Sequence, residues 1–193
     1  MLEKIDFAIL DFIQDTFVCK FLTVINKIFT TMGKMGAVWI LIAVIFFFFK
    51  KYRKYGFMIL VGLGVGLVVG NLFLKNVIAR PRPFEIKDIV LLIKEPGEFS
   101  FPSGHTLSSF ISATIILFAN KKLGIFSFVL ATLIALSRLY FFVHYPSDIL
   151  GGILLGVFIG IMVKQFFDIQ LNNNKNKPLW FSGFLFLFDI YFI

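Results

Sequence analysis

The sequence has little of what a soluble or disulfide-stabilised protein requires. Its single cysteine, Cys19, excludes an intramolecular disulfide and a cysteine-based metal cluster. Charged residues make up only 16% of the chain, so no long polar domain is expected. A basic start is also lacking, because Glu3, Asp6, Asp11 and Asp15 give the first residues the wrong sign for a cleavable signal peptide. We therefore expect the N-terminus to be retained.

Apolar residues dominate the chain instead. Of its 193 residues 59% are hydrophobic, 28 of them phenylalanine, and the mean hydropathy of +0.91 is far above that of a soluble domain. The net charge of +8 comes from lysines and arginines in short clusters between apolar runs, which fits anionic lipid better than nucleic acid. The composition predicts one all-α integral membrane domain, with the bilayer as its partner, no nucleic acid and no obligate protein partner.

Five apolar runs approach the roughly 20 residues that a membrane-spanning helix needs. They are Gly36–Phe49, Phe57–Leu74, Thr106–Ala119, Leu123–Val143 and Ile149–Phe167. A sixth segment, Ile5–Thr30, repeats apolar residues at helical spacing but carries several charges. We favour a sixth span there, which gives a bundle of about six helices, although a helix lying in the membrane interface fits nearly as well.

The domain boundary is set by a polar stretch near the C-terminus. Residues 1–170 are expected to form the membrane domain, residues 171–178 a polar linker rich in asparagine, and residues 179–193 an apolar tail. The tail is short for a span and contains an aspartate.

The basic clusters predict the orientation of the bundle. When the spans alternate in direction, three clusters fall on one side, which the positive-inside rule makes cytoplasmic. They are Lys50–Lys54, Lys121–Lys122 and the group Lys164, Lys175 and Lys177. The loop from Lys75 to Ser103 is then extracytoplasmic, although it is itself basic. A plasma-membrane location with an extracytoplasmic site is expected.

Two rows of glycines four residues apart predict close helix packing. One row is Gly62, Gly66 and Gly70, and the other is Gly152, Gly156 and Gly160. A nucleotide-binding loop around Gly62 is rejected, because no soluble strand and helix flank it.

The ionisable residues near the spans all reach the same membrane face, whichever face is outside. Such residues are costly in a membrane and usually mark a functional site. They are Lys75, Arg82, His105, Arg138, His144 and Asp148.

Each of the short motifs has a physical reason. Pro81 and Pro83 hold the chain extended and aim Arg82, whose fork matches phosphate oxygens. Ser103 is a suitable N-cap for a helix, and Gly104 lets a ligand approach the free N–H groups at that helix start.

His144 and Asp148 are four residues apart around a proline-initiated helix entry. If that turn is helical, the carboxylate reaches the imidazole, fixes its tautomer and leaves the other nitrogen free to attack. Arg138 would complete the cationic clamp.

Simpler roles fit several neighbouring residues. Arg80, Lys87 and Lys94 are assigned to headgroup contacts. The hydroxyls of Ser108, Ser109 and Ser112 are assigned to helix packing. No metal and no other cofactor is expected, because the two histidines and one aspartate lack a compact carboxylate cluster around them.

Together these motifs resemble the type 2 phosphatidic acid phosphatase superfamily of membrane lipid phosphatases. The three matching stretches are Lys75 followed after six residues by Arg82-Pro83, then Pro102–His105, then Ser137-Arg138 with His144 and Asp148 at the family's spacing. No motif position departs from the family pattern. The match covers Lys75 to Asp148, and the surrounding helices fit the family's six-span bundle.

The resemblance implies a role for each residue. His144 would form a phosphohistidine, Asp148 would orient it and His105 would protonate the leaving oxygen. The phosphate would be held by Lys75, Arg82, Arg138, Ser103 and Gly104, without metal.

The expected function is hydrolysis of a lipid phosphate monoester or diphosphate. Candidate substrates are undecaprenyl diphosphate, phosphatidylglycerophosphate and phosphatidic acid. Two alternatives stay open: a phosphotransferase that uses the same histidine, and a lipid-phosphate transporter with a vestigial site.

Overall fold

A computed structural model describes residues 2–174, and all regular secondary structure in this part of the chain is helical. Four stretches are long and apolar enough to cross a membrane: Lys20–Phe47, Arg53–Ile86, Lys121–Tyr140 and Pro146–Leu171. They surround a shorter apolar helix, α7 (Gly104–Ala119). The protein is therefore an integral membrane helical bundle, as predicted.

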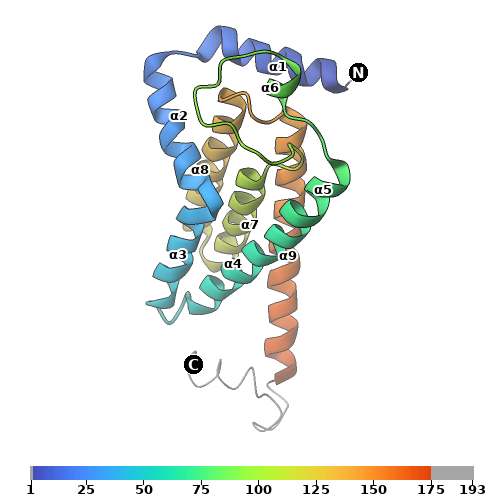
Figure 1. The fold of residues 1–193 in the computed structure, drawn as a ribbon. Helices are drawn as coiled ribbons and strands as arrows, with labels where there is room; N and C mark the ends of the chain where they lie inside the picture. The colour runs from blue at the N-terminus through green and yellow to red at the C-terminus, as the bar shows by residue number, and fades with distance from the viewer. Residues whose placement is uncertain (1, 175–193) are drawn as a thin grey trace.

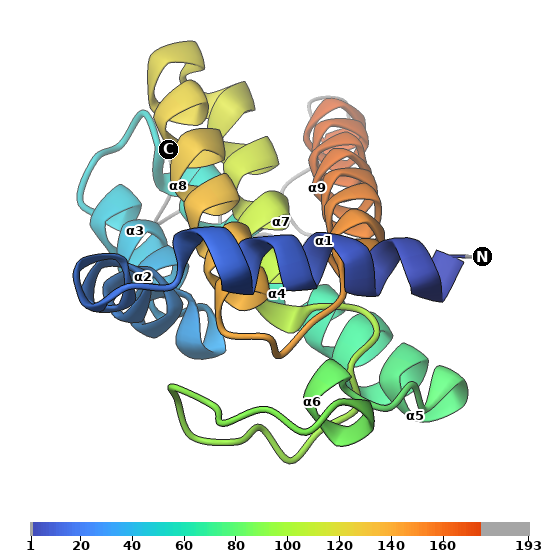
Figure 2. The ribbon, with the colours of Figure 1, turned by 90° about the horizontal axis from the view of Figure 1, so that it is seen from above.

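The first helix, α1 (Leu2–Phe17), lies across one end of the bundle rather than through it (Figures 1 and 2). The chain turns at Val18 and Cys19, and the Tyr140 hydroxyl secures this corner by accepting from the Cys19 N–H at 3.2 Å and donating to the Cys19 carbonyl at 3.1 Å. The prediction of one crossing helix over Ile5–Thr30 is thus wrong. Its first half lies across the end of the bundle, an arrangement that fits the alternative of a helix in the membrane interface.

The second half of that segment belongs to the first span. Helix α2 (Lys20–Gly33) continues through a short 3₁₀ turn (Lys34–Gly36) into α3 (Ala37–Phe47). The bend falls at Met35 and Gly36, with φ of 52° and 69°. Alone, the 11 residues of α3 would span only about 16 Å at 1.5 Å per residue, roughly half of a bilayer's apolar core. The predicted span Gly36–Phe49 is therefore the second half of one bent span.

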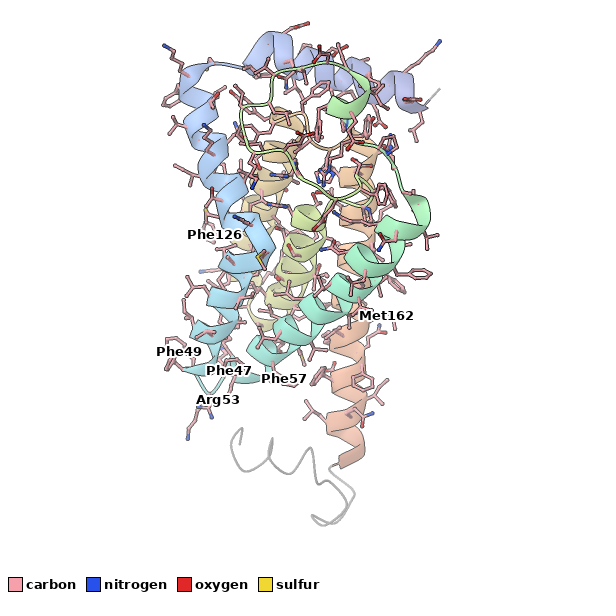
Figure 3. The ribbon with its side chains drawn as sticks, viewed as in Figure 1. Phe47, Phe49, Arg53, Phe57, Phe126 and Met162 are labelled. Atoms are coloured by element: carbon pink, nitrogen blue, oxygen red, sulfur yellow. The ribbon has the colours of Figure 1, made fainter. Side chains whose placement is uncertain are left out.

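The second span begins as α4 (Arg53–Gly66), passes through a π-helical stretch, η2 (Leu67–Leu74), and ends in α5 (Lys75–Ile78). A long loop follows, carrying α6 (Pro83–Ile86), and crosses the same end of the bundle as α1 (Figure 1). At the opposite end Arg53 donates through Nε to the Phe47 carbonyl at 3.0 Å, and Phe49 and Phe57 lie nearby (Figure 3).

Helix α7 is short because it is enclosed, packing against α4, α8 (Lys121–Tyr140) and α9 (Pro146–Asn174). Both glycine rows face it. A Cβ at Gly66 would meet the Ile111 side chain at 2.5 Å, and a Cβ at Gly156 would meet the Leu107 carbonyl at 2.9 Å. The predicted close packing is confirmed on both sides of α7. It fixes the N-terminus of α7 against its neighbours.

Helix α9 continues to Asn174, so the first residues assigned to the linker 171–178 are helical. The rest of that linker and the tail 179–193 lie outside the described residues. Residues 2–174 form four long spans, the enclosed α7 and α1 across one end, so the expected count of about six membrane-crossing helices is not confirmed.

Candidate active site

His144 lies in the tight turn between α8 and α9, at the end of the bundle that α1 covers (Figure 1). Its side chain is 2% exposed, and its Nδ1 lies 3.4 Å from Oδ2 of Asp148, which is fully buried. The same Oδ2 accepts the Tyr145 N–H at 2.9 Å and the Ser100 hydroxyl at 2.5 Å. The predicted contact across the i to i+4 turn is confirmed, and Asp148 is held rigidly.

The other ring nitrogen, Nε2, faces Arg82, whose Nη1 lies 3.3 Å away. A guanidinium only donates hydrogen bonds, so Nε2 is an acceptor and the ring proton belongs on Nδ1, toward Asp148. Burial lowers the pKa of His144 to about 3, overcoming its hydrogen bond to Asp148. The imidazole is therefore neutral at ordinary pH, and the lone pair on Nε2 points toward Arg82.

Arg82 is fixed by the loop around it. Pro81 and Pro83 flank it, and α6 begins at Pro83. Its guanidinium donates to the carbonyls of Glu98 at 2.6 Å and Val143 at 2.6 Å. Arg82 therefore ties the long loop to the histidine turn as well as reaching Nε2, which its sequence position alone does not indicate.

Lys75 lies near the end of the second span, where α5 begins. Its side chain is only 6% exposed, and Nζ donates to Oε2 of Glu98 at 2.6 Å. This hydrogen bond lowers the pKa of Glu98, which keeps the carboxylate ionised. The Lys75 ammonium is thus covered by a side chain from the long loop.

The start of α7 supplies the next group of residues. Ser103 is the N-cap as predicted, accepting the Thr106 N–H through its side chain. Gly104 lies under Asn71 of the π-helical stretch, where an added Cβ would come within 2.9 Å of Asn71 Oδ1. That oxygen is buried and accepts no hydrogen bond from the described residues. A π-helical stretch of this kind is frequent at functional sites.

His105 and Arg138 meet at α2. His105 Nε2 lies 3.2 Å from the Thr30 carbonyl, and Arg138 Nη1 donates to the Thr30 hydroxyl. Arg138 is 5% exposed, and its Nε has no hydrogen-bond partner among the described residues. One buried N–H of the guanidinium is therefore available to a ligand.

All eight residues expected from the sequence thus lie at one end of the bundle, and His144 contacts both Asp148 and Arg82 directly. Several residues that contact these eight are not indicated by the sequence pattern. Ser100, Glu98, Thr30 and Asn71 are polar residues whose sequence context carries no motif. Arg80, expected to contact headgroups, instead donates to Asp148 Oδ1 at 2.7 Å. That expectation is corrected by the structure.

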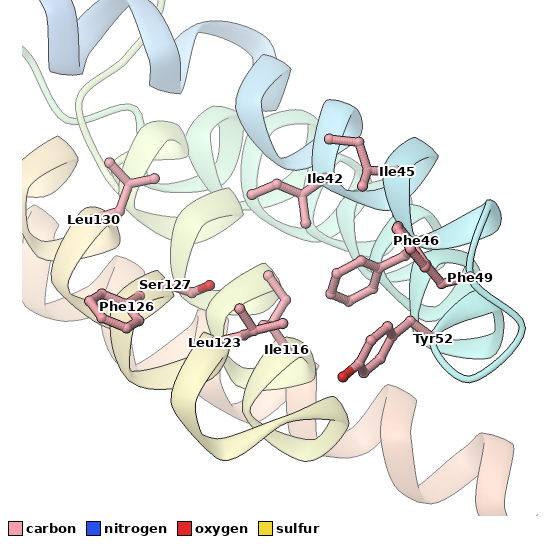
Figure 4. Close-up of a pocket in the computed structure, with 10 residues that line it drawn as sticks. All are labelled: Ile42, Ile45, Phe46, Phe49, Tyr52, Ile116, Leu123, Phe126, Ser127 and Leu130. Carbon is pink, nitrogen blue, oxygen red and sulfur yellow. The ribbon is translucent and has the colours of Figure 1, made fainter.

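Two further observations concern a metal cluster and a cavity elsewhere in the bundle. No three or more His, Cys, Asp or Glu side chains within residues 2–174 cluster so that they could hold a metal ion. A cavity of about 490 Å³ opens far from His144, among apolar side chains of α3, α7 and α8 (Figure 4). With Ser127 and Tyr52 as its only hydroxyl-bearing lining residues, it lacks the charges that a phosphate site needs.

Comparison with known proteins decides the family. Residues 51–171, more than half of the chain, match the PAP2 superfamily. The chain belongs to this superfamily. The resemblance predicted from the three motifs is confirmed. The prediction that the chain is a membrane-embedded phosphatase is confirmed as well.

Individual relatives agree with this placement. The chain is 33% identical to an undecaprenyl-diphosphatase of Sulfolobus acidocaldarius over 73% of this chain and 70% of that protein. It is 31% identical to phosphatidylglycerophosphatase B of Bacillus subtilis, over 79% and 80%.

Solved structures share the fold. A transmembrane PAP2-type phosphatidylglycerolphosphate phosphatase from Bacillus subtilis superposes with a TM-score of 0.69 at 28% identity, covering 91% of this chain and 88% of that one. Aquifex aeolicus LpxE gives 0.69 at 27% identity, over 83% and 95%.

Proposed function

We propose that this PAP2 protein removes phosphate from a lipid phosphate monoester or diphosphate through a phosphohistidine formed on His144. One observation carries the proposal: a neutral imidazole, with its proton directed to Asp148, presents Nε2 beside a cluster of buried cations. A nucleophile held in this tautomer by a carboxylate is the arrangement that covalent catalysis requires.

The phosphoryl group would lie between Nε2 of His144 and the three cations Lys75, Arg82 and Arg138. The unpartnered Nε of Arg138 supports this placement, because a phosphate oxygen can accept that buried N–H. At the start of α7, which Ser103 caps, the backbone N–H of Gly104 is proposed to add a donor for the same anion.

The reaction has two steps. In the first, with His105 in its imidazolium form, His144 Nε2 attacks phosphorus, the bond to the leaving oxygen breaks, and His105 gives its extra proton to that oxygen. In the second, water attacks the phosphohistidine, His105 accepts a proton from this water, and the P–N bond breaks to release inorganic phosphate. The developing charge on the phosphoryl oxygens is balanced by the surrounding cations.

The substrate is proposed to be undecaprenyl diphosphate, phosphatidylglycerophosphate or phosphatidic acid. The first two are supported by the names of the similar proteins, and all three present a phosphate at the headgroup level. This depth matches a site at the end of a membrane bundle.

The site is proposed to face away from the cytoplasm, in the plasma membrane. The loop between α3 and α4, with Lys50 and Lys51, and the start of α4, with Arg53 and Lys54, lie at the opposite end of the bundle from the histidine turn (Figure 1). The start of α8, with Lys121 and Lys122, lies at that end as well. The positive-inside rule places such clusters in the cytoplasm. Residues 1–170 are proposed to form the membrane phosphatase domain.

The test is phosphate release by the purified protein in detergent, in excess EDTA, from a panel of the three lipids, with His144→Ala as control. We expect release from at least one lipid by the wild type and none by the variant. Failure of the wild type on every lipid, or equal release by His144→Ala, would overturn the proposal.

A further inference from the structure

Asp6 of helix α1 directs its carboxylate toward the turn between α8 and α9 that carries His144. Asp6 is 2% exposed although it belongs to a helix at the end of the bundle. Its Oδ1 accepts the Ser147 N–H at 3.0 Å, and its Oδ2 accepts the Ser147 hydroxyl at 2.5 Å and Nη2 of Arg80 at 2.8 Å. Asp6 thus holds the residue that precedes Asp148 and, through Arg80, contacts Asp148 indirectly.

Arg80 bridges two buried carboxylates. Its Nη2 serves Asp6, while its Nη1 donates to Asp148 Oδ1 at 2.7 Å and to the Ser147 hydroxyl at 2.7 Å. The guanidinium lies 3.7 Å from the centre of the Tyr145 ring, which fixes its plane. With all these partners the side chain has a single orientation.

The balance of charge in this cluster matters for His144. If Arg80 served Asp148 alone, the guanidinium would neutralise the carboxylate that must stabilise positive charge developing on the imidazole. Because Asp6 shares the same guanidinium, two carboxylates and one cation leave the cluster with one net negative charge. Asp148 can then still act on the His144 ring.

We propose that Asp6 is a positioning residue of the catalytic centre, acting through Arg80 and Ser147 on the Asp148–His144 pair, so that docking of α1 completes the active site. The inference rests on the proposed function of His144. Aromatic contacts support the docking, since the Phe7 ring meets Tyr145 edge-on at 5.5 Å and Phe142 at 6.4 Å.

The outer face of α1 is suited to the membrane surface. Its exposed apolar residues recur at helical spacing, at Leu2, Ile5, Ile9 and Phe12, each at least 40% exposed. A helix with such a stripe lies in the interface, at the depth of lipid headgroups. The element that holds Asp6 therefore lies at the level where the substrate's phosphate arrives.

The chain offers a matched control for Asp6. Asp11 lies on the same helix and pairs with Lys87 of the same long loop at 2.5 Å, but this pair is exposed and no described contact connects it to Asp148. Asp6→Asn and Asp11→Asn each remove one charge between α1 and the loop. Only the former touches the proposed network.

The measurements are kcat, single-turnover phosphorylation of His144, inhibition by inorganic phosphate, and thermal unfolding in detergent. We expect Asp6→Asn to lower kcat and the phosphorylation rate by about tenfold or more, equivalent to about 1.4 kcal/mol, while inhibition by phosphate changes less than about threefold. Asp11→Asn should stay within about twofold of wild type. Ser147→Ala, which removes the hydroxyl shared by Asp6 and Arg80, gives a second variant if Asp6→Asn does not fold.

A double-mutant cycle tests the route through Arg80. If Asp6 acts through the guanidinium, Asp6→Asn should have little further effect in an Arg80→Gln background. Independent multiplication of the two losses would overturn the inference. So would an unchanged kcat in Asp6→Asn, or a loss of kcat, phosphate affinity and thermal stability in parallel, which would indicate a structural role only.

Failure of the proposed function can be distinguished from failure of this inference, because in the first case the wild-type protein itself would be inactive. In that case the Nδ1 proton resonance of His144 still tests the positioning. It should shift in Asp6→Asn and not in Asp11→Asn, and an identical resonance in both variants would contradict the inference.

Discussion

Glu98 Oε2 lies 2.6 Å from Lys75 Nζ. The Glu98 carboxylate is thus already paired with one of the cations proposed to bind the substrate phosphate. The backbone carbonyl of Glu98 also accepts the Arg82 Nε–H at 2.6 Å. The Glu98 side chain is 67% exposed, whereas that of Lys75 is 6% exposed. An incoming phosphate would therefore compete with a solvent-facing anion for a buried cation.

Removing this charge should strengthen phosphate binding. In Glu98→Gln the Lys75 ammonium loses its anionic partner, so we expect inhibition by inorganic phosphate at about three- to tenfold lower concentration. Glu95→Gln, a change of the same kind in the same loop, should leave inhibition unchanged. An equal affinity in wild type and Glu98→Gln would show that Glu98 does not compete for this site. Because Lys75 lowers the pKa of Glu98, acidification should mimic the variant only below the ordinary range of glutamate.

The lowered pKa of His144 predicts how stability depends on pH. The folded protein keeps this imidazole neutral down to about pH 3, whereas the unfolded chain takes up a proton near the ordinary value of 6.5. Below that ordinary value the unfolded state binds more protons, so the group should destabilise the fold by about 1.4 kcal/mol per pH unit. His144→Gln should therefore lose less thermal stability than wild type between pH 7 and pH 5. Parallel losses would mean that His144 is not buried in its neutral form.

Arg138 and Arg82, the two arginines proposed to bind the phosphate, should differ in how much they contribute to thermal stability. Arg138→Lys keeps the charge but removes the free Nε donor, so we expect kcat/KM to fall at least about tenfold with little change in unfolding temperature. Arg82→Lys also deprives the carbonyls of Glu98 and Val143 of donors, so kcat/KM and thermal stability should fall together. Unchanged kinetics in both variants would remove these arginines from the site.

The proposed orientation can be read with a thiol reagent. Glu95→Cys, in a Cys19→Ser background, should react with an impermeant maleimide in intact cells, because the positive-inside rule places the long loop outside. A cysteine at Lys51, between α3 and α4, should react only after the membrane is disrupted. The reverse pattern would invert the topology.

How far the sequence determines the site can be judged from particular residues. His105, Arg138, His144 and Asp148 are predictable because ionisable side chains at span ends are rare and the spans bring them to one face. The fixed spacing of four residues makes the His144–Asp148 contact a property of one helical turn. Asp6 and Arg80 were not predictable in the same way, because their contacts with the turn depend on how α1 docks.

The N-terminal helices show why the fold was only partly predictable. Ile5–Thr30 has the periodicity of one long helix, and the break at Val18 and Cys19 carries neither proline nor glycine. The corner depends on a distant partner, the Tyr140 hydroxyl, and on the burial of Asp6. Hydropathy alone cannot separate a span that is bent at Met35 and Gly36 from two separate elements.

The two histidines should be separable by the leaving group. A nucleophile is required whatever departs, whereas a general acid matters in proportion to the basicity of the departing oxygen. On a lipid monoester, whose leaving alkoxide is very basic, we expect His105→Ala to lose roughly 10²- to 10⁴-fold in rate, the usual contribution of proton transfer. His144→Ala should lose nearly all activity on the same substrate.

With p-nitrophenyl phosphate, whose leaving group departs without a proton, His105→Ala should recover much of its deficit relative to wild type, while His144→Ala stays inactive. His105 differs from His144 in its contacts, because its Nε2 lies 3.2 Å from the Thr30 carbonyl of α2 and no described contact joins it to Asp148. Acid-quenched His105→Ala should still carry phosphate on His144 after reaction with the activated ester. If His144→Ala were the variant that p-nitrophenyl phosphate rescues, the roles assigned to the two histidines would have to be exchanged.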